Sequence, residues 1–312
     1  MRVIVTGATG FVGQSLIKSL IFDGIQVVGV GRRHLSGQSF EYHVIQDYVA
    51  YGDWQSKLAG CDAVIHLAAR VHMMKESSAD PLAEFRRVNV DGTLNLANQA
   101  AAAGVNRFVY LSSIKVNGEH TAPGKPFTED DIASPEDAYG YSKIEAEQGL
   151  WLIAQKTGME VVIIRPPLVY GRGMKANFAR MVHAVRLGIP LPLGAIHNKR
   201  SFVSIDNLIS LIVLCINHPN AANQVFLVSD GYDLSTTTLL QMCANALNVQ
   251  GRLLPVPQKW SEFFSRVLGK SHVYQRLCGN LQLDISKASQ LLGWVPPVTV
   301  IDGLRRAVDS KD

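Results

Sequence analysis

A glycine-rich turn follows the first apolar run of the chain, Val3–Thr6, and leads into an amphipathic stretch, Phe11–Phe22. The turn reads GATGFVG. Its first glycine permits a tight turn, its second lets backbone N–H groups approach a pyrophosphate, and its third lets the helix pack closely on the strand. We therefore predict a dinucleotide site that includes Gly7, Gly10, Phe11, Val12 and Gly13. Glycines that serve only the turn itself are the alternative.

Short apolar runs alternate with longer amphipathic segments through the first half of the chain. This pattern is typical of a parallel sheet wrapped by helices. We predict an α/β, doubly wound parallel sheet whose strands are Val3–Thr6, Gln26–Val30, His43–Gln46, Ala63–Leu67, Arg107–Leu111 and Val161–Arg165.

The pattern changes after Pro166–Pro167. Helical and isolated strand segments then follow one another, namely Asn177–Gly188, Arg200–Ser204, Asn207–His218, Gln224–Val228, Ser286–Leu292 and Ile301–Ser310. We expect residues 1–170 to form a dinucleotide-binding domain to which residues 201–228 return. Residues 171–200 and 229–312 would form a smaller, mixed α/β substrate domain. A ligand cleft is expected between the two domains, at the carboxyl ends of the strands.

Charge and cysteine content exclude several classes of protein. The 312 residues include 30 Lys and Arg and 26 Asp and Glu, which leaves a formal charge of +4. Basic residues form no run longer than a pair, so we expect no nucleic-acid partner. The four cysteines lie far apart and form no CxxC pair, which argues against a redox dithiol, a zinc knuckle or a disulfide scaffold.

Membrane and metal sites are likewise not indicated. The longest apolar stretch, Leu208–Ile216, is far shorter than the ~18 apolar residues that a membrane span needs. The first strand begins at the second residue, where a signal peptide would need a basic and then an apolar segment. We expect a cytoplasmic protein. The nine histidines include no HxH or HxxxH pair, so no catalytic metal is expected.

Two arginines, Arg32 and Arg33, follow the second predicted strand, and no acidic residue lies between Gly24 and Phe40. A carboxylate in this region would bind the ribose 2′-hydroxyl of NAD, whereas arginines suit the 2′-phosphate of NADP. We therefore favour NADP(H), with NAD(H) as the alternative. Solvated surface arginines are the other interpretation.

Tyr139 and Lys143 are four residues apart in a predicted helix, so both side chains lie on one face of it. A phenol has a pKa of about 10, and a neighbouring ammonium together with a cationic nicotinamide would lower it. Tyr139 could then move the proton of a sugar hydroxyl while hydride moves to or from the cofactor. Tyr141 has no lysine four residues further on. A chance pair on an exposed helix is the alternative.

Two polar residues elsewhere are weaker candidates. Ser113 follows the fifth strand, where its hydroxyl could hydrogen-bond the reacting oxygen, although capping of the strand end is an alternative. Asn89 lies in a predicted helix, where asparagine is a mediocre former, so a role in organising the site remains open.

Together these motifs identify a family. The chain resembles the extended short-chain dehydrogenase/reductases, specifically their nucleotide-sugar epimerase/dehydratase branch. The resemblance rests on GxxGxxG at residue 7, HLAA at 66–69, residues 89–93, Ser112–Ser113, YxxxK at 139 and RPPLVYG at 165–171, and it extends to LLGW at 291–294. It implies a Rossmann domain that binds NAD(P) and a smaller C-terminal domain that binds a nucleoside-diphosphate sugar. A helix-packed homodimer, through Leu82–Ala103 and Glu145–Ile153, is also expected.

The resemblance assigns roles to single residues. Ser113, Tyr139 and Lys143 would be catalytic. Ser113, Asn177 and Arg200 would bind the substrate, the last two at its diphosphate, where an arginine is chemically well suited. The cofactor would contact the glycine turn and further residues: Arg32, Arg33, Asp47, Tyr48, Leu67, Ala68, Ala69, Asn89, Tyr139, Lys143 and Pro166.

Ile114 and Lys115 help to select the reaction. Sugar-nucleotide 4,6-dehydratases resemble one another in carrying an Asp–Glu pair at these positions, because elimination of water needs an extra acid and base. Neither side chain here can supply that pair, which argues against dehydration and leaves two expected reactions at C4.

The arginines after the second strand favour a reductase that consumes NADPH. The segments 111–119 and 165–171 also resemble bacterial reductases of UDP-4-keto-6-deoxy-N-acetylglucosamine, which serve surface polysaccharide synthesis and are commonly labelled UDP-glucose 4-epimerase. We predict this reduction, with 4-epimerisation of UDP-glucose or UDP-N-acetylglucosamine as the alternative. A non-catalytic dinucleotide-binding regulator is a remote third possibility, because such proteins have usually lost the Tyr, the Lys or the third glycine.

Overall fold

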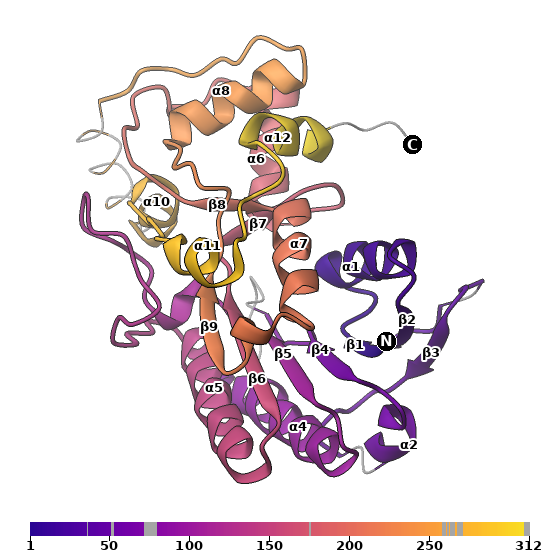
Figure 1. Ribbon diagram of the computed structural model, residues 1–312. Helices are drawn as coiled ribbons and strands as arrows, with labels where there is room; N and C mark the ends of the chain where they lie inside the picture. Colours follow the sequence, from indigo (N-terminus) through magenta and orange to yellow (C-terminus); the bar gives the residue numbers. More distant parts are fainter. Residues whose placement is uncertain are drawn as a thin grey trace.

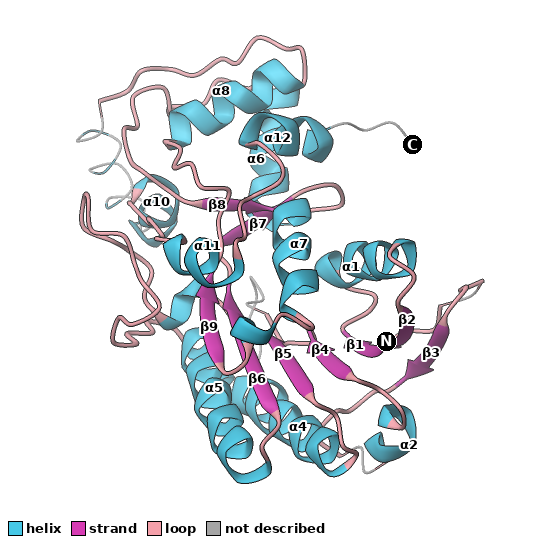
Figure 2. Ribbon diagram, viewed as in Figure 1, coloured by secondary structure: helices cyan, strands magenta, loops and turns pink. Residues whose placement is uncertain are grey.

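A seven-stranded sheet forms the centre of the protein (Figure 2). The computed structural model describes residues 1–35, 37–50, 53–71, 80–174, 176–257 and 271–308, together with Trp260, Glu262 and Arg266. All neighbouring strands of this sheet pair in parallel. Their spatial order is β3 (Glu41–Val44), β2 (Gln26–Gly31), β1 (Arg2–Thr6), β4 (Ala63–His66), β5 (Arg107–Leu111), β6 (Glu160–Arg165) and β9 (Gln224–Leu227). The predicted Rossmann-type fold is confirmed.

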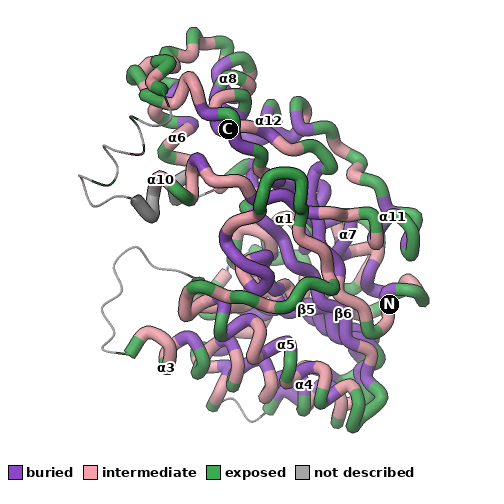
Figure 3. The backbone as a smooth tube through the Cα atoms, turned by 90° about the vertical axis from the view of Figure 1, so that its left-hand side faces the viewer, coloured by how far each residue is buried: buried purple, intermediate pink, exposed green. Residues whose placement is uncertain are grey.

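Helices cover both faces of this sheet (Figure 1). The helices α1 (Phe11–Phe22) and α7 (Ile205–Cys215) lie side by side on one face, where Leu16 and Leu208 share a core with Val5. On the other face lie α2 (Trp54–Leu58), α4 (Gly92–Ala102) and α5 (Ala138–Thr157). Because alternate strand residues point to opposite faces, Ile4 packs with this second group. The strands β5 and β6 are accordingly buried (Figure 3).

The remaining elements gather around a second, smaller parallel pair of strands, β7 (Leu168–Tyr170) with β8 (Phe202–Ser204). Their apolar side chains, including Tyr170 and Phe202, pack against helices from the C-terminal part of the chain. These helices are α6 (Ala176–Arg186), α8 (Thr236–Ala246) and α12 (Val300–Val308), while α10 (Ser271–Cys278) and α11 (Ser286–Leu292) lie nearer the large sheet in Figure 1.

Segments of the large-sheet region and of the region around β7 and β8 alternate along the chain more often than we expected. Within 201–228, α7 and β9 lie with the large sheet, but β8 pairs with β7 instead. From the expected substrate segment 229–312, Leu292 and Trp294 join the core under the large sheet, and the Trp294 indole donates to Ser210 Oγ at 2.8 Å. Burial of these large apolar side chains attaches α11 to the region of the large sheet.

Some element boundaries also differ from the expectation. The third strand begins at Glu41 rather than His43, because its edge position suits a charged residue, which pairs with Arg2 at 2.7 Å. The helix α8 was not predicted. It begins at Thr236 with Ser235 as its cap, in a Ser/Thr-rich stretch whose composition favours a loop. The predicted helix Ile301–Ser310 is observed over Val300–Val308, and residues 309–312 are outside the described part.

The short α3 (Pro81–Arg86) and the π-helix η1 (Arg87–Asp91) precede α4, and the 3₁₀ helix η2 (Ile114–Val116) follows β5. A final 3₁₀ turn, η3 (Pro219–Ala221), precedes β9. Across the described residues, we find no helix long and apolar enough to cross a membrane.

Candidate active site

A cleft of about 680 Å³ lies at the carboxyl ends of β1 to β5. This is the edge at which parallel sheets of this kind bind ligands. Most residues predicted to contact a cofactor line it: Gly7, Gly10, Phe11, Val12, Gly13, Arg32, Asp47, Tyr48, Leu67, Ala68, Ala69, Tyr139 and Lys143. The fold thus brings the turns after five strands together with the start of α5, so that Gly7 and Lys143, 136 positions apart in the sequence, line one cleft.

The glycine turn has the close contacts that its spacing suggests. Gly7 has φ +69°, and a Cβ there would lie 2.9 Å from the amide nitrogen of Ala68. A Cβ on Gly13 would lie 2.2 Å from the carbonyl oxygen of Gly7. Gly10 is the N-cap of α1 and has no side chain to occupy the first amides of the helix. These amides are therefore free of side-chain caps and suit the pyrophosphate of a dinucleotide.

Charged side chains surround the far end of the cleft, after β2 and β3. Arg32 is exposed and lines the cleft. Asp47 also lines it and pairs with Arg87, a cleft residue that the sequence did not single out. The hydrogen bonds from the Val49 and Ala50 amides, followed by the Arg87 cation, lower the pKa of Asp47. This end of the cleft therefore carries at least two arginines and one ionised carboxylate.

Tyr139 and Lys143 meet at the other end of the cleft, in the first turns of α5. Lys143 Nζ lies 5.8 Å from the centre of the Tyr139 ring. It donates to the Tyr110 hydroxyl at 3.1 Å and to the Leu111 carbonyl at 2.9 Å, and the residue is only 2% exposed. Ser113 lies close enough to the Tyr139 phenol to act on its pKa, which it lowers. The three predicted catalytic residues are thus neighbours.

Ser113 also has a local capping role at the end of β5. Its hydroxyl accepts from the Lys115 amide at 3.3 Å and so caps η2. It is Ser112, rather than Ser113, that lines the cleft.

Burial dominates the electrostatics of the tyrosine and the lysine. It raises the pKa of Tyr139 well above its usual value, and the charge of Asp137 adds to this. It also lowers the pKa of Lys143 to about 7, against the opposing effect of Glu147. The expected lowering of the Tyr139 pKa is therefore wrong for the protein alone. Desolvation disfavours the phenolate, and the ammonium of Lys143 bonds to Tyr110 and Leu111 rather than to the Tyr139 oxygen.

A buried ion pair directly behind these residues was missed by the sequence analysis. Arg165 binds Glu147 through both carboxylate oxygens, at 3.1 and 2.5 Å, and their side chains are 7% and 1% exposed. Ser112 donates to the same carboxylate, and Asn117 Oδ1 accepts from Arg165 at 3.0 Å. Glu147 follows Lys143 by four residues, so the helical period could have placed it on the same face. The pair joins α5 to the ends of β5 and β6.

Three predicted cofactor residues do not line the cleft. Arg33 is exposed outside it, with its carbonyl accepting from the Tyr42 hydroxyl at 2.6 Å. Pro166 is buried and accepts from the Ile114 amide at 3.0 Å. Asn89 is 1% exposed; it donates to the Arg70 carbonyl at 3.0 Å and accepts from its amide at 2.8 Å. Asn89 thus supports the loop after β4 from behind, in keeping with an organising role.

Arg200, which we predicted to bind the substrate, does not line this cleft. The Arg200 guanidinium donates to the Gly279 carbonyl at 2.9 Å, and burial lowers its pKa to about 10, so it keeps its charge at neutral pH. Asn177 belongs to the first turn of α6, and its side chain is outside the described residues. Residues 72–79 also lie outside the described residues.

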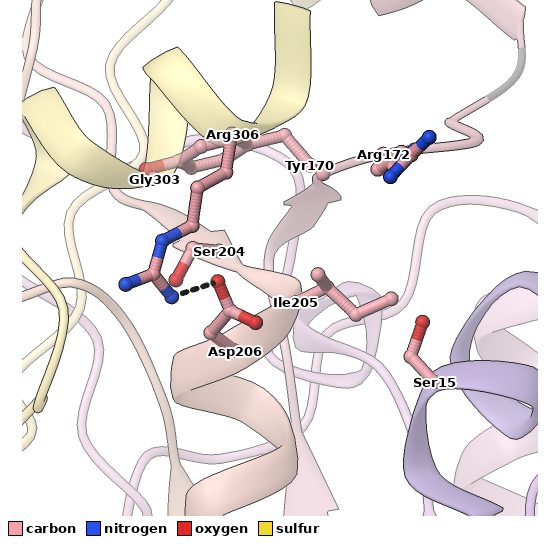
Figure 4. A pocket seen from close by; sticks show the side chains of 9 residues that line it. Ser15, Tyr170, Arg172, Ser204, Ile205, Asp206, Gly303 and Arg306 are labelled. Carbon is pink, nitrogen blue, oxygen red and sulfur yellow. Dashed lines mark hydrogen bonds and ion pairs between the residues drawn. The ribbon is translucent and has the colours of Figure 1, made fainter. Parts of the chain in front are cut away.

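A second cavity, of about 330 Å³, shares no residue with the cleft (Figure 4). It lies between α1, the end of β7, the start of α7 and α12. Arg306 and Asp206 face each other across it, and their closest atoms are 3.0 Å apart. Two charged side chains of this cavity thus form an ion pair with each other.

We find no group of three potential metal ligands in the part of the chain that the structure describes. The four cysteines are buried and form no disulfide.

Residues 3–229 match the NAD dependent epimerase/dehydratase family. The chain belongs to this family. The resemblance seen in the sequence is confirmed, and with it the prediction of an enzyme that uses a nicotinamide dinucleotide.

The relatives include a 4-epimerase and a reductase of nucleotide sugars. The chain is 48% identical over 313 residues to a UDP-glucose 4-epimerase of Vibrio cholerae, which covers 99% of this chain and 94% of the relative. It is 27% identical over 313 residues to a GDP-6-deoxy-D-mannose reductase of Pseudomonas aeruginosa, covering 97% and 95%.

Among solved structures, UDP-glucuronic acid 4-epimerase from Bacillus cereus in complex with NAD has a TM-score of 0.79 at 22% identity. The match covers 98% of this chain and 97% of that one. At this identity the similarity establishes the shared fold.

Proposed function

We propose that this protein is a 4-epimerase of a UDP-hexose. The observation that carries the proposal is the 48% identity to a UDP-glucose 4-epimerase along 99% of the chain. The sequence had favoured reduction of a UDP-4-keto-6-deoxy-N-acetylhexosamine and kept epimerisation as the alternative. The comparison supports the alternative better, and the reductase stays a prediction that the same experiment tests.

The glycine turn supports a bound dinucleotide. A Cβ at Gly7 or Gly13 would fill the space against Ala68 and the Gly7 carbonyl, and the start of α1 offers uncapped amides to the pyrophosphate. When bound, the dinucleotide supplies a reversible hydride acceptor.

In the proposed reaction, Tyr139 removes the proton of the C4 hydroxyl as hydride leaves C4, which becomes a ketone. After the ketone turns over, hydride returns to its other face and Tyr139 gives the proton back. Ser113, which lies next to Tyr139, would donate its hydroxyl proton in a hydrogen bond to the C4 oxygen. Lys143, with a pKa of about 7, is partly charged at neutral pH, and a cationic ring in the cleft would add to the field that favours phenolate.

The choice between NADP and NAD stays a prediction. Arg32 lines the cleft and Arg33 does not, so the preference for NADP(H) rests on Arg32. Arg200 and Asn177 would hold the diphosphate of the UDP-sugar. We retain the homodimer and the cytoplasmic location as proposals.

The decisive experiment separates the two reactions by their cofactor demand. The purified protein is assayed for interconversion of UDP-glucose and UDP-galactose, and of their N-acetyl forms, without added cofactor. In parallel, NADPH oxidation is followed with a UDP-4-keto-6-deoxy-N-acetylhexosamine. Denatured protein is analysed for released NAD or NADP.

Interconversion on stoichiometric bound cofactor supports the epimerase, and Tyr139→Phe should abolish it while cofactor stays bound. NADPH oxidation without interconversion would replace the proposal by the reductase. Inactivity in both assays would reject both functions.

A further inference from the structure

Four charged side chains meet at the start of α5 and join three elements that are distant in the sequence. Lys115 Nζ, from η2, lies 2.5 Å from Glu119 Oε1 and 2.5 Å from Asp137 Oδ2. Arg276 from α10 approaches the same carboxylates, with Nε 3.4 Å from Glu119 Oε2 and Nη2 3.8 Å from Asp137 Oδ2. Two cations and two anions thus form one neutral group, which we call the Lys115 cluster.

The Lys115 cluster is partly shielded from water. The Glu119 side chain is 6% exposed, and those of Lys115 and Asp137 are 24% and 22% exposed. Burial would raise the pKa of both carboxyls, but Lys115 and Arg276 lower it, and the net shift for each is downward. Both carboxylates are therefore ionised at neutral pH, in surroundings where charges act more strongly than in bulk water.

The cluster is also rigidly attached to the helix that carries Tyr139. Asp137 is the N-cap of α5, and its Oδ1 accepts from the Gly140 amide at 2.8 Å. A Cβ on Gly140 would lie 2.9 Å from the Lys115 carbonyl oxygen, so η2 packs directly on the first turn of α5. This packing consequently fixes the position of η2, which carries Lys115, relative to the turn of α5 that carries Tyr139.

The charge of Asp137 reaches Tyr139, which follows it by two residues. After burial, this charge is the next cause of the raised pKa of Tyr139. An anion at this place opposes the phenolate that proton transfer requires. The Lys115 ammonium is bound to the other oxygen of Asp137, and a cation at this place would offset the field of the anion at Tyr139.

We propose that Lys115 is a positioning residue for Tyr139: it neutralises Asp137 at the cap of α5 and, through Glu119, ties this cap to α10. From the sequence alone, we used Lys115 only as an argument against dehydration. The inference rests on the proposed acid/base role of Tyr139, but it applies equally to epimerisation and reduction.

The groups that face Tyr139 come from three elements: Asp137 and Lys143 of α5, Tyr110 and Ser113 of β5 and its following loop, and Phe85 of α3. The charged residues of α3 have other partners, Glu84 with Arg70 and Arg86 with Glu145. Asp137 and its counter-charge are thus the pair whose removal changes the field at Tyr139 without touching the catalytic side chains.

The test changes the charge in both directions. Lys115→Met removes the cation, whereas Asp137→Asn removes the anion but keeps an oxygen that can cap α5. Lys115→Arg is the conservative rescue. Arg86→Met is the matched control, because it removes a cation paired with Glu145 of the same helix, at an exposed site.

For each variant, kcat/KM is measured against pH in whichever C4 reaction the wild type performs. The pKa of Tyr139 is measured separately by NMR of protein labelled with ¹³Cζ-tyrosine, and its signal is assigned by its loss in Tyr139→Phe. Cofactor binding and circular dichroism establish that each variant is folded.

We expect Lys115→Met to move the ascending limb of the profile and the Tyr139 titration to higher pH by about 0.5 unit or more, and Asp137→Asn to move both to lower pH. Lys115→Arg and Arg86→Met should match the wild type. Damage to the fold would not give shifts of opposite sign. Unchanged titrations in both variants, or equal shifts in Arg86→Met, would overturn the inference. If the wild type is inactive in both assays, the proposed function fails, and the NMR titrations still decide this point.

Discussion

The buried pair of Glu147 and Arg165 gives the sharpest prediction on stability. We consider Glu147→Met, which keeps the length of the side chain but leaves the Arg165 guanidinium buried with Asn117 as its remaining partner. Because the two side chains are 1% and 7% exposed, solvent cannot take the place of the lost carboxylate. Removing one partner of such a pair costs about 3–5 kcal/mol of unfolding free energy.

The same helix provides a matched control. Glu145 pairs with Arg86 at 2.6 Å, but these side chains are 29% and 50% exposed. Exposed pairs contribute at most about 1 kcal/mol, so Glu145→Met should have a small effect. The double variant Glu147→Met, Arg165→Met replaces both charges by apolar groups and should regain most of the loss.

Urea unfolding of the wild type and the four variants, including Arg165→Met, completes a double-mutant cycle. We expect a coupling energy of several kcal/mol for Glu147 with Arg165. A loss below about 1 kcal/mol for Glu147→Met, or a double variant less stable than both single ones, would refute the reasoning.

Three further predictions concern the cofactor and pH. Gly13→Ala should abolish dinucleotide binding in a calorimetric titration, because its Cβ would lie 2.2 Å from the Gly7 carbonyl oxygen; undiminished binding contradicts this. Arg32→Glu should weaken NADPH binding more than NADH binding, whereas Arg33→Glu, outside the cleft, should have the smaller effect; equal losses for both cofactors in Arg32→Glu would reject the NADP preference. Burial lowers the pKa of Lys143 to about 7, below its unfolded value, so the unfolded chain binds more protons between these pKa values. Relative to Lys143→Met, the wild type should therefore gain stability in urea as the pH rises from 7 towards 10, and a flat or falling difference would contradict the shift.

The sequence alone predicted the elements whose signal is local. The strands β1, β5 and β6 are continuous apolar runs bounded by polar residues, and the helix α5 begins at a capping Asp137 and ends at Gly158, with φ +77°. The glycine spacing and the four-residue interval from Tyr139 to Lys143 are also local patterns, because a turn or a single helix defines their geometry. For the same reason, most of the predicted cofactor residues line the cleft.

Other features arise from contacts that no local pattern encodes. The pairing of β8 with β7, and the attachment of Trp294 to the core below the large sheet, depend on which apolar surfaces meet after folding. Asn89 and Pro166 occupy positions of the family motifs, yet both are buried away from the cleft. Asn89 is hydrogen-bonded to the Arg70 backbone, and the Pro166 carbonyl accepts from the Ile114 amide. Local spacing cannot show to which side of a loop a residue turns.

What the sequence by itself determined is the dinucleotide fold, because this depends on hydrophobic period and glycine geometry. It also proposed Ser113, Tyr139 and Lys143 as the reacting trio, from helical spacing and the family resemblance. Only the tertiary structure decided the electrostatic setting of that trio. Glu147 of α5 meets Arg165 of β6, and Lys115 of η2 meets Asp137, which is 22 residues away in the sequence. Burial, which follows from the packing of the whole chain, raises the pKa of Tyr139 and lowers that of Lys143. Charge interactions depend on distance and exposure in three dimensions, and neither quantity can be read from the order of residues.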